Sequence, residues 1–155
     1  MEKVVELLIK LNKTISVMES CTGGGIANAI TNVSGSSLAF NYGAVTYSNE
    51  YKIKMGVPSD IIDKYTVYSS EVAIAMARAI SNYTNSNYGV GVTGKLKKFD
   101  EANPYGEDDI VYLAIYDRDN DICYNEKIKL ISDSRIDCKT EIINILVNKM
   151  KEIIK

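Results

Sequence analysis

A glycine-bearing loop near the amino terminus holds the first residues that could do chemistry. Residues 19–25 (ESCTGGG) follow a short β-branched segment and precede a stretch typical of a helix. Backbone N–H groups at the start of a helix attract anions, and glycines allow a phosphate or an oxyanion to approach closely. Ser20 and Cys21 are adjacent candidate nucleophiles in this loop. The alternative is a turn whose serine or threonine only caps the following helix.

A tyrosine and a lysine form the second candidate group. Tyr47 and Lys52 lie in the segment 46–52 (TYSNEYK). If a strand ends near Tyr47 and a helix begins near Ser48, both side chains lie at the sheet edge where α/β proteins bind ligands. A lysine desolvated there could be neutral near pH 7 and could deprotonate a serine. The alternative is an exposed lysine on a short helix and a tyrosine that packs its ring.

The chain contains no histidine, and this narrows the chemistry available to it. Ser-His and Cys-His nucleophile pairs and histidine-ligated zinc are excluded within the chain. Proton transfer would use Asp, Glu, Lys, Tyr or Cys. A lysine or tyrosine in that role needs a shifted pKa.

Length and composition predict a single globular domain, 1–155. The 155 residues are 46% hydrophobic and carry a net charge of -2, enough for a core and a ligand pocket. Without a basic stripe or an apolar run of membrane-spanning length, we expect no nucleic-acid partner and no membrane partner. The three distant cysteines indicate free thiols in a reducing compartment, and the acidic start of the chain is unlike a signal peptide, so we expect a cytoplasmic protein. The oligomeric state stays open, a homo-oligomer included.

Charged residues gather at two later positions. Residues 93–109 have a basic half and an acidic half. The basic half contains Lys95, Lys97 and Lys98, and the acidic half contains Asp100, Glu101, Glu107, Asp108 and Asp109. Clustered carboxylates could bind a divalent metal, but a solvated surface loop explains them more simply, so we predict no metal. Arg135 and Lys139, four residues apart on the last predicted helix, could contact a phosphate or could point to solvent.

Hydrophobic spacing predicts the elements that position these residues. Helices are expected at 2–12, 26–33, 49–55 and about 134–154, with a further long helix capped by Ser69 or Ser70. Strands are expected at 14–18, 39–47 and 87–92, followed by a β-hairpin of 110–116 with 122–130. Strands that alternate with helices, with one added hairpin, predict a three-layer α/β/α sandwich on a mixed, mostly parallel sheet.

Several motifs, taken in order, resemble those of the CinA C-terminal domain family. They are ESCTGG at 19–24, GSS at 35–37, VTYSNEYK at 45–52, GVP at 56–58, YSSEVA at 68–73, VTG at 92–94 and a looser match at Arg135, Cys138 and Lys139. The resemblance covers nearly the whole chain. Active members of that family are nicotinamide-nucleotide amidohydrolases, which deamidate nicotinamide mononucleotide to nicotinate mononucleotide and ammonia.

The resemblance implies roles for individual residues and an amidase that works without cofactor or metal. Ser20 would match the nucleophile, Lys52 the general base, and Tyr47 the hydroxyl that assists the proton relay. Amides of the glycine loop would hold the oxyanion, and a small nucleotide would be the substrate. The residues expected to contact it are Cys21, Thr22, Gly23, Gly24, Ser36, Asn49, Thr93, Gly94, Arg135 and Lys139.

The chain departs from the family pattern after Gly94. The family continues with a glycine-rich loop, Ile-Ala-Gly-Pro-Gly-Gly, whereas residues 95–100 read KLKKFD. Bulky charged residues cannot follow the same tight backbone path, so one wall of the substrate pocket is rewritten. In addition, Lys139 stands where the family suggests arginine, which loses bidentate phosphate binding.

Three hypotheses follow from these observations. The first is a serine/lysine amidohydrolase acting on a pyridine nucleotide or a related amide, favoured by Ser20, Tyr47 and Lys52. The second is a non-catalytic ligand-binding or interaction domain, favoured by the change after Gly94. The third keeps hydrolysis but makes Cys21 the nucleophile, although only the helix amino terminus would stabilise its thiolate.

Overall fold

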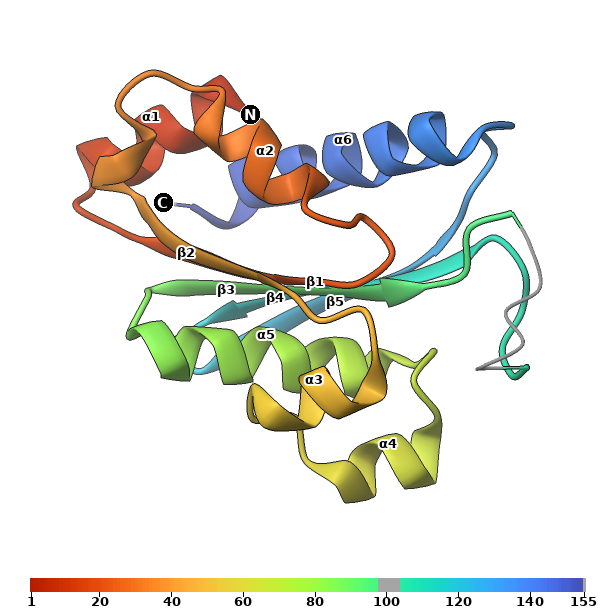
Figure 1. The fold of residues 1–155 in the computed structure, drawn as a ribbon. Helices are drawn as coiled ribbons and strands as arrows, with labels where there is room; N and C mark the ends of the chain where they lie inside the picture. The colour runs from red at the N-terminus through yellow and green to blue at the C-terminus, as the bar shows by residue number, and fades with distance from the viewer. Residues whose placement is uncertain (98–103, 155) are drawn as a thin grey trace.

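The computed structural model describes residues 1–97 and 104–154, so the predictions made for Lys98, Asp100 and Glu101 lie outside the described residues. A sheet with the strand order β2-β1-β3-β4-β5 forms the centre of the molecule (Figure 1). Its strands are β1 (Ile15–Glu19), β2 (Phe40–Val45), β3 (Tyr88–Gly94), β4 (Ile110–Asp117) and β5 (Ile122–Lys129). Each expected strand is therefore present, with bounds shifted by one or two residues.

The sheet is mixed, and four of its five strands run in one direction. β1 pairs in parallel with both β2 and β3, whereas β4 pairs antiparallel with β3 and with β5. Only β4 therefore runs against the others. The predicted mixed, mostly parallel sheet is confirmed.

Helices cover both faces of the sheet, which confirms the predicted three-layer sandwich (Figure 1). One face carries α1 (Glu2–Lys10), α2 (Gly25–Thr31) and α6 (Arg135–Ile153), and the other carries α3 (Asn49–Lys54), α4 (Ser59–Tyr65) and α5 (Ser70–Thr84). A short 3-10 helix, η1 (Ser36–Leu38), precedes β2. No helix within the described residues is long and apolar enough to cross a membrane.

Local sequence explains where the longer elements begin and how closely they pack. The side chains of Ser69 and Ser134 cap α5 and α6 by accepting hydrogen bonds from backbone N–H groups one turn on, as serine does at helix starts. Gly89 and Gly91 let α5 lie directly on β3, because a Cβ at either position would come within 2.2 Å of a helix carbonyl oxygen. This close packing holds α5 and its preceding turn against the middle of the sheet.

The carboxyl ends of the three parallel strands meet at one edge of the sheet. Glu19, the last residue of β1, pairs with Val45 of β2 on one side and Val92 of β3 on the other. The residues that follow these strands are therefore neighbours in space. They include Ser20 and Thr46, which begin the two segments that the sequence singles out.

Candidate active site

A serine and a lysine from different elements meet at this edge. The Nζ atom of Lys52 lies 3.2 Å from Ser20 Oγ and donates a second hydrogen bond, of 2.8 Å, to the carbonyl oxygen of Thr46. Lys52 is 1% exposed and has no carboxylate partner among the described residues, which is rare for a lysine. The expected approach of Ser20 and Lys52 is thus present in the structure.

The path of the chain after β2 explains why Lys52 points inward. Ser48 caps α3 by accepting a hydrogen bond from the backbone N–H of Tyr51. Lys52 then lies in the last turn of this short helix, on the side that faces the sheet edge, and is the buried residue of α3. Its neighbour Lys54 points to solvent and pairs with Glu50. Two lysines two residues apart on a helix therefore have opposite environments.

Burial changes the protonation of Lys52. Loss of solvation lowers the pKa of the Lys52 amine to about 8, although the nearby Cys21 thiol opposes this shift. At pH 7 roughly a tenth of the molecules then carry a neutral amine, against fewer than about one in a thousand for an ordinary lysine. A neutral amine beside a serine hydroxyl can accept its proton, so the pair has the chemistry of a base and a nucleophile.

Cys21 is poorly suited to be the nucleophile. Its side chain is buried, and this burial raises the pKa of the thiol to about 12 despite the opposing charges of Lys52 and Lys139. The thiolate is the nucleophilic form of cysteine, and it is scarce at neutral pH when the pKa is so high. Ser20 is therefore the better candidate of the two.

Glu19 is a structural residue of the site that the sequence reasoning did not single out. Its carboxylate is 1% exposed and accepts hydrogen bonds from the backbone N–H groups of Gly24, Ile26 and Ala27, at 2.8–3.1 Å. A carboxylate at a helix amino terminus is stabilised by the free N–H groups and by the helix dipole. An acidic residue between a buried strand and a helix is the signal that could have identified it.

The Glu19 carboxylate corrects the expectation that the glycine loop offers free amides to an anion. Gly24 N–H donates to Glu19, and the N–H groups of Gly23 and Gly25 donate to carbonyl oxygens within the same loop. Across the described residues, the N–H groups of Cys21 and Thr22 have no hydrogen-bond acceptor, and the buried Thr22 hydroxyl has no partner either. The donors available to an oxyanion thus follow Ser20 directly.

Tyr47 is separate from the Ser20–Lys52 pair. Its side chain is 65% exposed, and the structure gives its hydroxyl no hydrogen bond to either residue. Asn49 lies one turn before Lys52 in α3 and is partly buried. The structure therefore brings together two of the three expected catalytic residues, and it places Tyr47 on the surface that flanks them.

Thr93 and Gly94 lie at the same edge of the sheet as Ser20, but their contacts in the structure are with other parts of the protein. The buried Thr93 hydroxyl donates to the carbonyl oxygen of Val67, which ties β3 to the turn before α5. Gly94 lies so close to β4 that a Cβ there would meet backbone atoms at 2.6 Å. Their expected contact with substrate remains a prediction.

The two basic residues of α6 both face this region. The Nζ atom of Lys139 lies 3.3 Å from the position that a Cβ on Gly23 would occupy, so it borders the glycine loop. The guanidinium of Arg135 donates to the carbonyl oxygen of Leu96, in the segment after β3. Lys139 is the better placed of the two to meet an anion near Ser20.

Ser36 lies apart from the Ser20–Lys52 pair within a single chain, and its expected contact with substrate stays a prediction. It begins η1, which leads into the amino end of β2, whereas Ser20 follows the carboxyl end of β1. The length of the parallel strands separates the two positions, roughly 15 Å at about 3.3 Å per residue. The direction of β2 therefore places Ser36 at the opposite edge of the sheet.

The two described ends of the segment 93–109 differ: residues 104–108 are exposed, as expected of a solvated loop, whereas residues 93–97 are largely buried. Lys95 is buried and lies 3.5 Å from the Asp108 carboxylate. The backbone N–H of Lys97 donates to Asp109, and its ammonium lies 3.5 Å from the same carboxylate. Across the residues that the structure describes, no three His, Cys, Asp or Glu side chains are grouped as a metal site would require.

Fold and site define a class of protein: an α/β domain with a buried lysine–serine pair at the carboxyl ends of its parallel strands. The chain matches the CinA C-terminal domain over residues 1–152, and it belongs to that family. The match spans all of the motifs on which the sequence resemblance rests, and it confirms that resemblance.

Relatives and solved structures agree with this assignment. A competence-damage inducible protein of Clostridium kluyveri is 45% identical over 120 residues, which cover 76% of this chain and 29% of that protein. A Clostridium botulinum protein of the same name is 45% identical over 94 residues, 60% of this chain and 23% of its own length. The chain therefore spans less than a third of the curated relatives it matches.

Two solved structures match almost the whole chain. The competence/damage inducible protein CihA from Agrobacterium tumefaciens is 26% identical, with a TM-score of 0.82, and the match covers 97% of this chain and 94% of that one. A competence or damage-inducible protein from Enterobacter asburiae has a TM-score of 0.86 at 19% identity, covering 99% and 94% of the two chains. The second likeness shows the fold alone.

Proposed function

We propose that this chain is an amidohydrolase that deamidates nicotinamide mononucleotide, or a related pyridine-nucleotide amide, to the acid and ammonia. The observation that carries the proposal is the 3.2 Å contact between Lys52 Nζ and Ser20 Oγ in a buried setting. Membership of the CinA C-terminal domain family supports it further. The substrate class comes from the family resemblance, and the chemistry comes from the pair.

In the first half of the reaction, Ser20 attacks the carboxamide carbon. The neutral Lys52 amine takes the hydroxyl proton as the Oγ–C bond forms, and the carbonyl oxygen becomes an oxyanion. The N–H groups of Cys21 and Thr22 are the donors left for that oxyanion. The C–N bond then breaks, Lys52 returns its proton to the leaving nitrogen, and ammonia departs.

In the second half, water hydrolyses the acyl-enzyme. Lys52, neutral again, takes a proton from the attacking water, and the new C–O bond yields a second oxyanion. Its collapse breaks the Oγ–C bond, and Lys52 returns the proton to Ser20 Oγ. Lys139 would attract the nucleotide phosphate near the glycine loop, because the ammonium borders Gly23 and has no acceptor among the described residues.

An ammonia-release assay on nicotinamide mononucleotide tests the proposal. Ser20→Ala and Lys52→Met should each reduce kcat by at least about a thousandfold, because each removes a partner of the reacting pair. Lys54→Met is the matched control, since it removes a solvent-facing lysine from the same helix. Its kcat should stay within about twofold of wild type.

The same assay decides between catalysis and the alternative of a non-catalytic binding domain. The buried Lys95 beside Asp108 supports that alternative, because it shows side chains filling space next to the end of β3. A folded wild-type protein that releases no ammonia from nicotinamide mononucleotide or related amides, yet binds one of them by calorimetry, would establish the binding domain. Activity that survives Ser20→Ala would refute the assigned nucleophile.

A further inference from the structure

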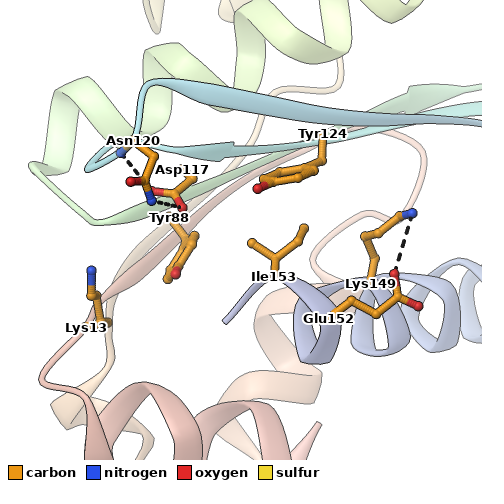
Figure 2. Close-up of a pocket in the computed structure, with 8 residues that line it drawn as sticks. All are labelled: Lys13, Tyr88, Asp117, Asn120, Tyr124, Lys149, Glu152 and Ile153. Atoms are coloured by element: carbon orange, nitrogen blue, oxygen red, sulfur yellow. Dashed lines mark hydrogen bonds and ion pairs between the residues drawn. The ribbon is translucent and has the colours of Figure 1, made fainter. Parts of the chain in front are cut away.

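A cavity lies at the end of the sheet opposite to the Ser20–Lys52 pair. Figure 2 shows it between the last turns of α6 and the sheet, where β3 begins and β4 ends. Its volume is about 410 Å³, and its lining includes Lys13, Tyr88, Asp117 and Tyr124. Cavities of this size bind small molecules in many proteins. The proposed reaction uses none of these residues.

Two tyrosine rings and an isoleucine supply the apolar surface of the cavity. Tyr88 of β3 and Tyr124 of β5 stand on the sheet, and Ile153 of α6 lies between them (Figure 2). Tyr88 is 3% exposed, yet its hydroxyl has no hydrogen-bond partner among the described residues. Burial and the charge of Asp117 raise the pKa of Tyr88, so its hydroxyl stays protonated. Because Tyr88 lines the cavity, a ligand there can reach this hydroxyl and hydrogen-bond to it.

The two lysines around the cavity both form ion pairs with carboxylates. Lys13 forms an ion pair with Asp119, which also accepts hydrogen bonds from the side chain of Asn87. On the other side, Lys149 pairs with Glu126 and lies 3.8 Å from Glu152. Neither ammonium is left over to attract an anion into the cavity.

Asp117 is the buried carboxylate of the cavity lining, and the Lys13 ammonium acts on it at longer range. Its side chain is 3% exposed and accepts hydrogen bonds from the backbone and side-chain N–H groups of Asn120, but it has no ion pair within the described residues. With the paired groups and Arg118, whose charge acts on Asp119, three basic side chains here face four carboxylates. A buried carboxylate is stabilised by a cation that reaches it.

We propose that this cavity is a binding site for a small organic cation, an ammonium group carried on an apolar or aromatic body. Asp117 is the counter-charge, and the Tyr88 hydroxyl accepts a hydrogen bond from the ammonium. The rings of Tyr88 and Tyr124 enclose the body of the ligand and attract its positive charge through their faces. The site is independent of the proposed deamidation, because it lies at the other end of β1 and β3.

Titration with three isosteric probes tests the charge of the ligand. Benzylammonium, benzyl alcohol and benzoate are added to the ¹⁵N-labelled chain, and backbone amide shifts are followed by NMR. We expect benzylammonium to bind with a dissociation constant on the order of 1 mM, as suits its size. Its shifts should centre on residues 87–88, 117–120 and 149–153. The alcohol and the benzoate should bind at least about tenfold more weakly.

Two conservative variants test the residues, and a third serves as the control. Asp117→Asn keeps an acceptor for Asn120 but removes the charge, so benzylammonium affinity should fall about tenfold. Tyr88→Phe removes only the hydroxyl and should weaken binding about threefold. Asp63→Asn changes an exposed carboxylate of α4, on the other face of the sheet, and should have no effect.

Three results would overturn the proposal. They are no binding of benzylammonium by the folded protein, equal or tighter binding of benzoate, and benzylammonium affinity unchanged in Asp117→Asn. Each variant is first compared with wild type by its amide spectrum, so that a lost fold is not mistaken for a lost site. Ammonia release plays no part in the readout, so the outcome stands apart from that of the deamidation assay.

Discussion

Replacing Lys52 by methionine should stabilise the protein at pH 7 while it removes the proposed base. Lys52 is protonated in most molecules at that pH, although it is 1% exposed and has no carboxylate partner in the described chain. An ammonium in such a place destabilises the fold relative to a neutral side chain. Methionine has a similar length and shape and carries no charge, so it fills the same space without that cost.

The magnitude follows from the pKa of Lys52. A fall from 10.5 to about 8 corresponds to a destabilisation of about 3 kcal/mol when the lysine is charged. Methionine also loses the hydrogen bonds to Ser20 and Thr46, worth about 1 kcal/mol each. The net effect at pH 7 is therefore a gain of about 1 kcal/mol in the free energy of unfolding of Lys52→Met.

The pH dependence gives a sharper test than a single value. Below pH 8 the lysine is protonated in both the folded and unfolded states, so the buried ammonium destabilises the fold to its full extent. Between about 8 and 10.5 the folded protein releases this proton while the unfolded chain keeps it, so wild-type stability rises with pH. Lys52→Met lacks this contribution. By pH 10 the unfolding free energy of Lys52→Met minus that of wild type should have fallen by about 2.5 kcal/mol and become negative.

Urea unfolding of both proteins at pH 7, 8, 9 and 10, followed by circular dichroism, measures this difference. Groups that titrate in both proteins cancel in the comparison. Lys54→Met replaces a lysine that points to solvent, so its unfolding free energy should stay within about 0.5 kcal/mol of wild type throughout. A Lys52→Met difference that does not change between pH 7 and 10 would refute the depressed pKa and, with it, the source of a neutral base.

Three further predictions concern groups around the site. Glu19→Gln should lower the unfolding free energy by about 2–3 kcal/mol in urea titrations, because three N–H groups lose a charged acceptor. Ser134→Ala, at an exposed helix cap, should cost only about 1 kcal/mol. Gly94→Ala should lower the melting temperature, because the new Cβ would lie 2.6 Å from the backbone of β4. Gly25→Ala is the control and should not lower it, because the nearest atom to its Cβ would lie at 3.5 Å. Equal melting temperatures for the two variants would contradict this reasoning. Tyr47→Phe should leave stability unchanged because the side chain is exposed, and unchanged ammonia release would exclude Tyr47 from the proton relay.

Sequence reasoning located the central pair because two local signals agreed. A β-branched segment before Ser20 and a capped helix around Lys52 both predict residues at the carboxyl ends of neighbouring parallel strands, and those ends meet at one edge. The same logic places Ser36 at the opposite edge of the sheet, since that residue precedes its strand. Membership of the same set of motifs does not by itself imply proximity in space.

Other features depend on contacts between distant residues and have no local signal. Lys95 is a residue type that normally lies at the surface, yet it is buried against Tyr68 and lies 3.5 Å from Asp108, at the other end of the same loop. The role of Glu19 depends on the turn that brings the N–H groups of α2 back over the end of β1. Spacing along the chain does not reveal that these N–H groups are already occupied.

The position of β2 at the edge of the sheet has a consequence for how the Ser20–Lys52 pair comes apart. β2 pairs only with β1 and is largely exposed, and Thr46, whose carbonyl oxygen anchors Lys52, follows it directly. Segments with few buried contacts open at lower free energy than the whole fold. Detachment of β2 would carry Lys52 away from Ser20 while β1, β3 and β4 stayed paired. Warming should therefore abolish the proposed ammonia release in a partly opened molecule, at temperatures where most of the sheet still protects its amide hydrogens from exchange.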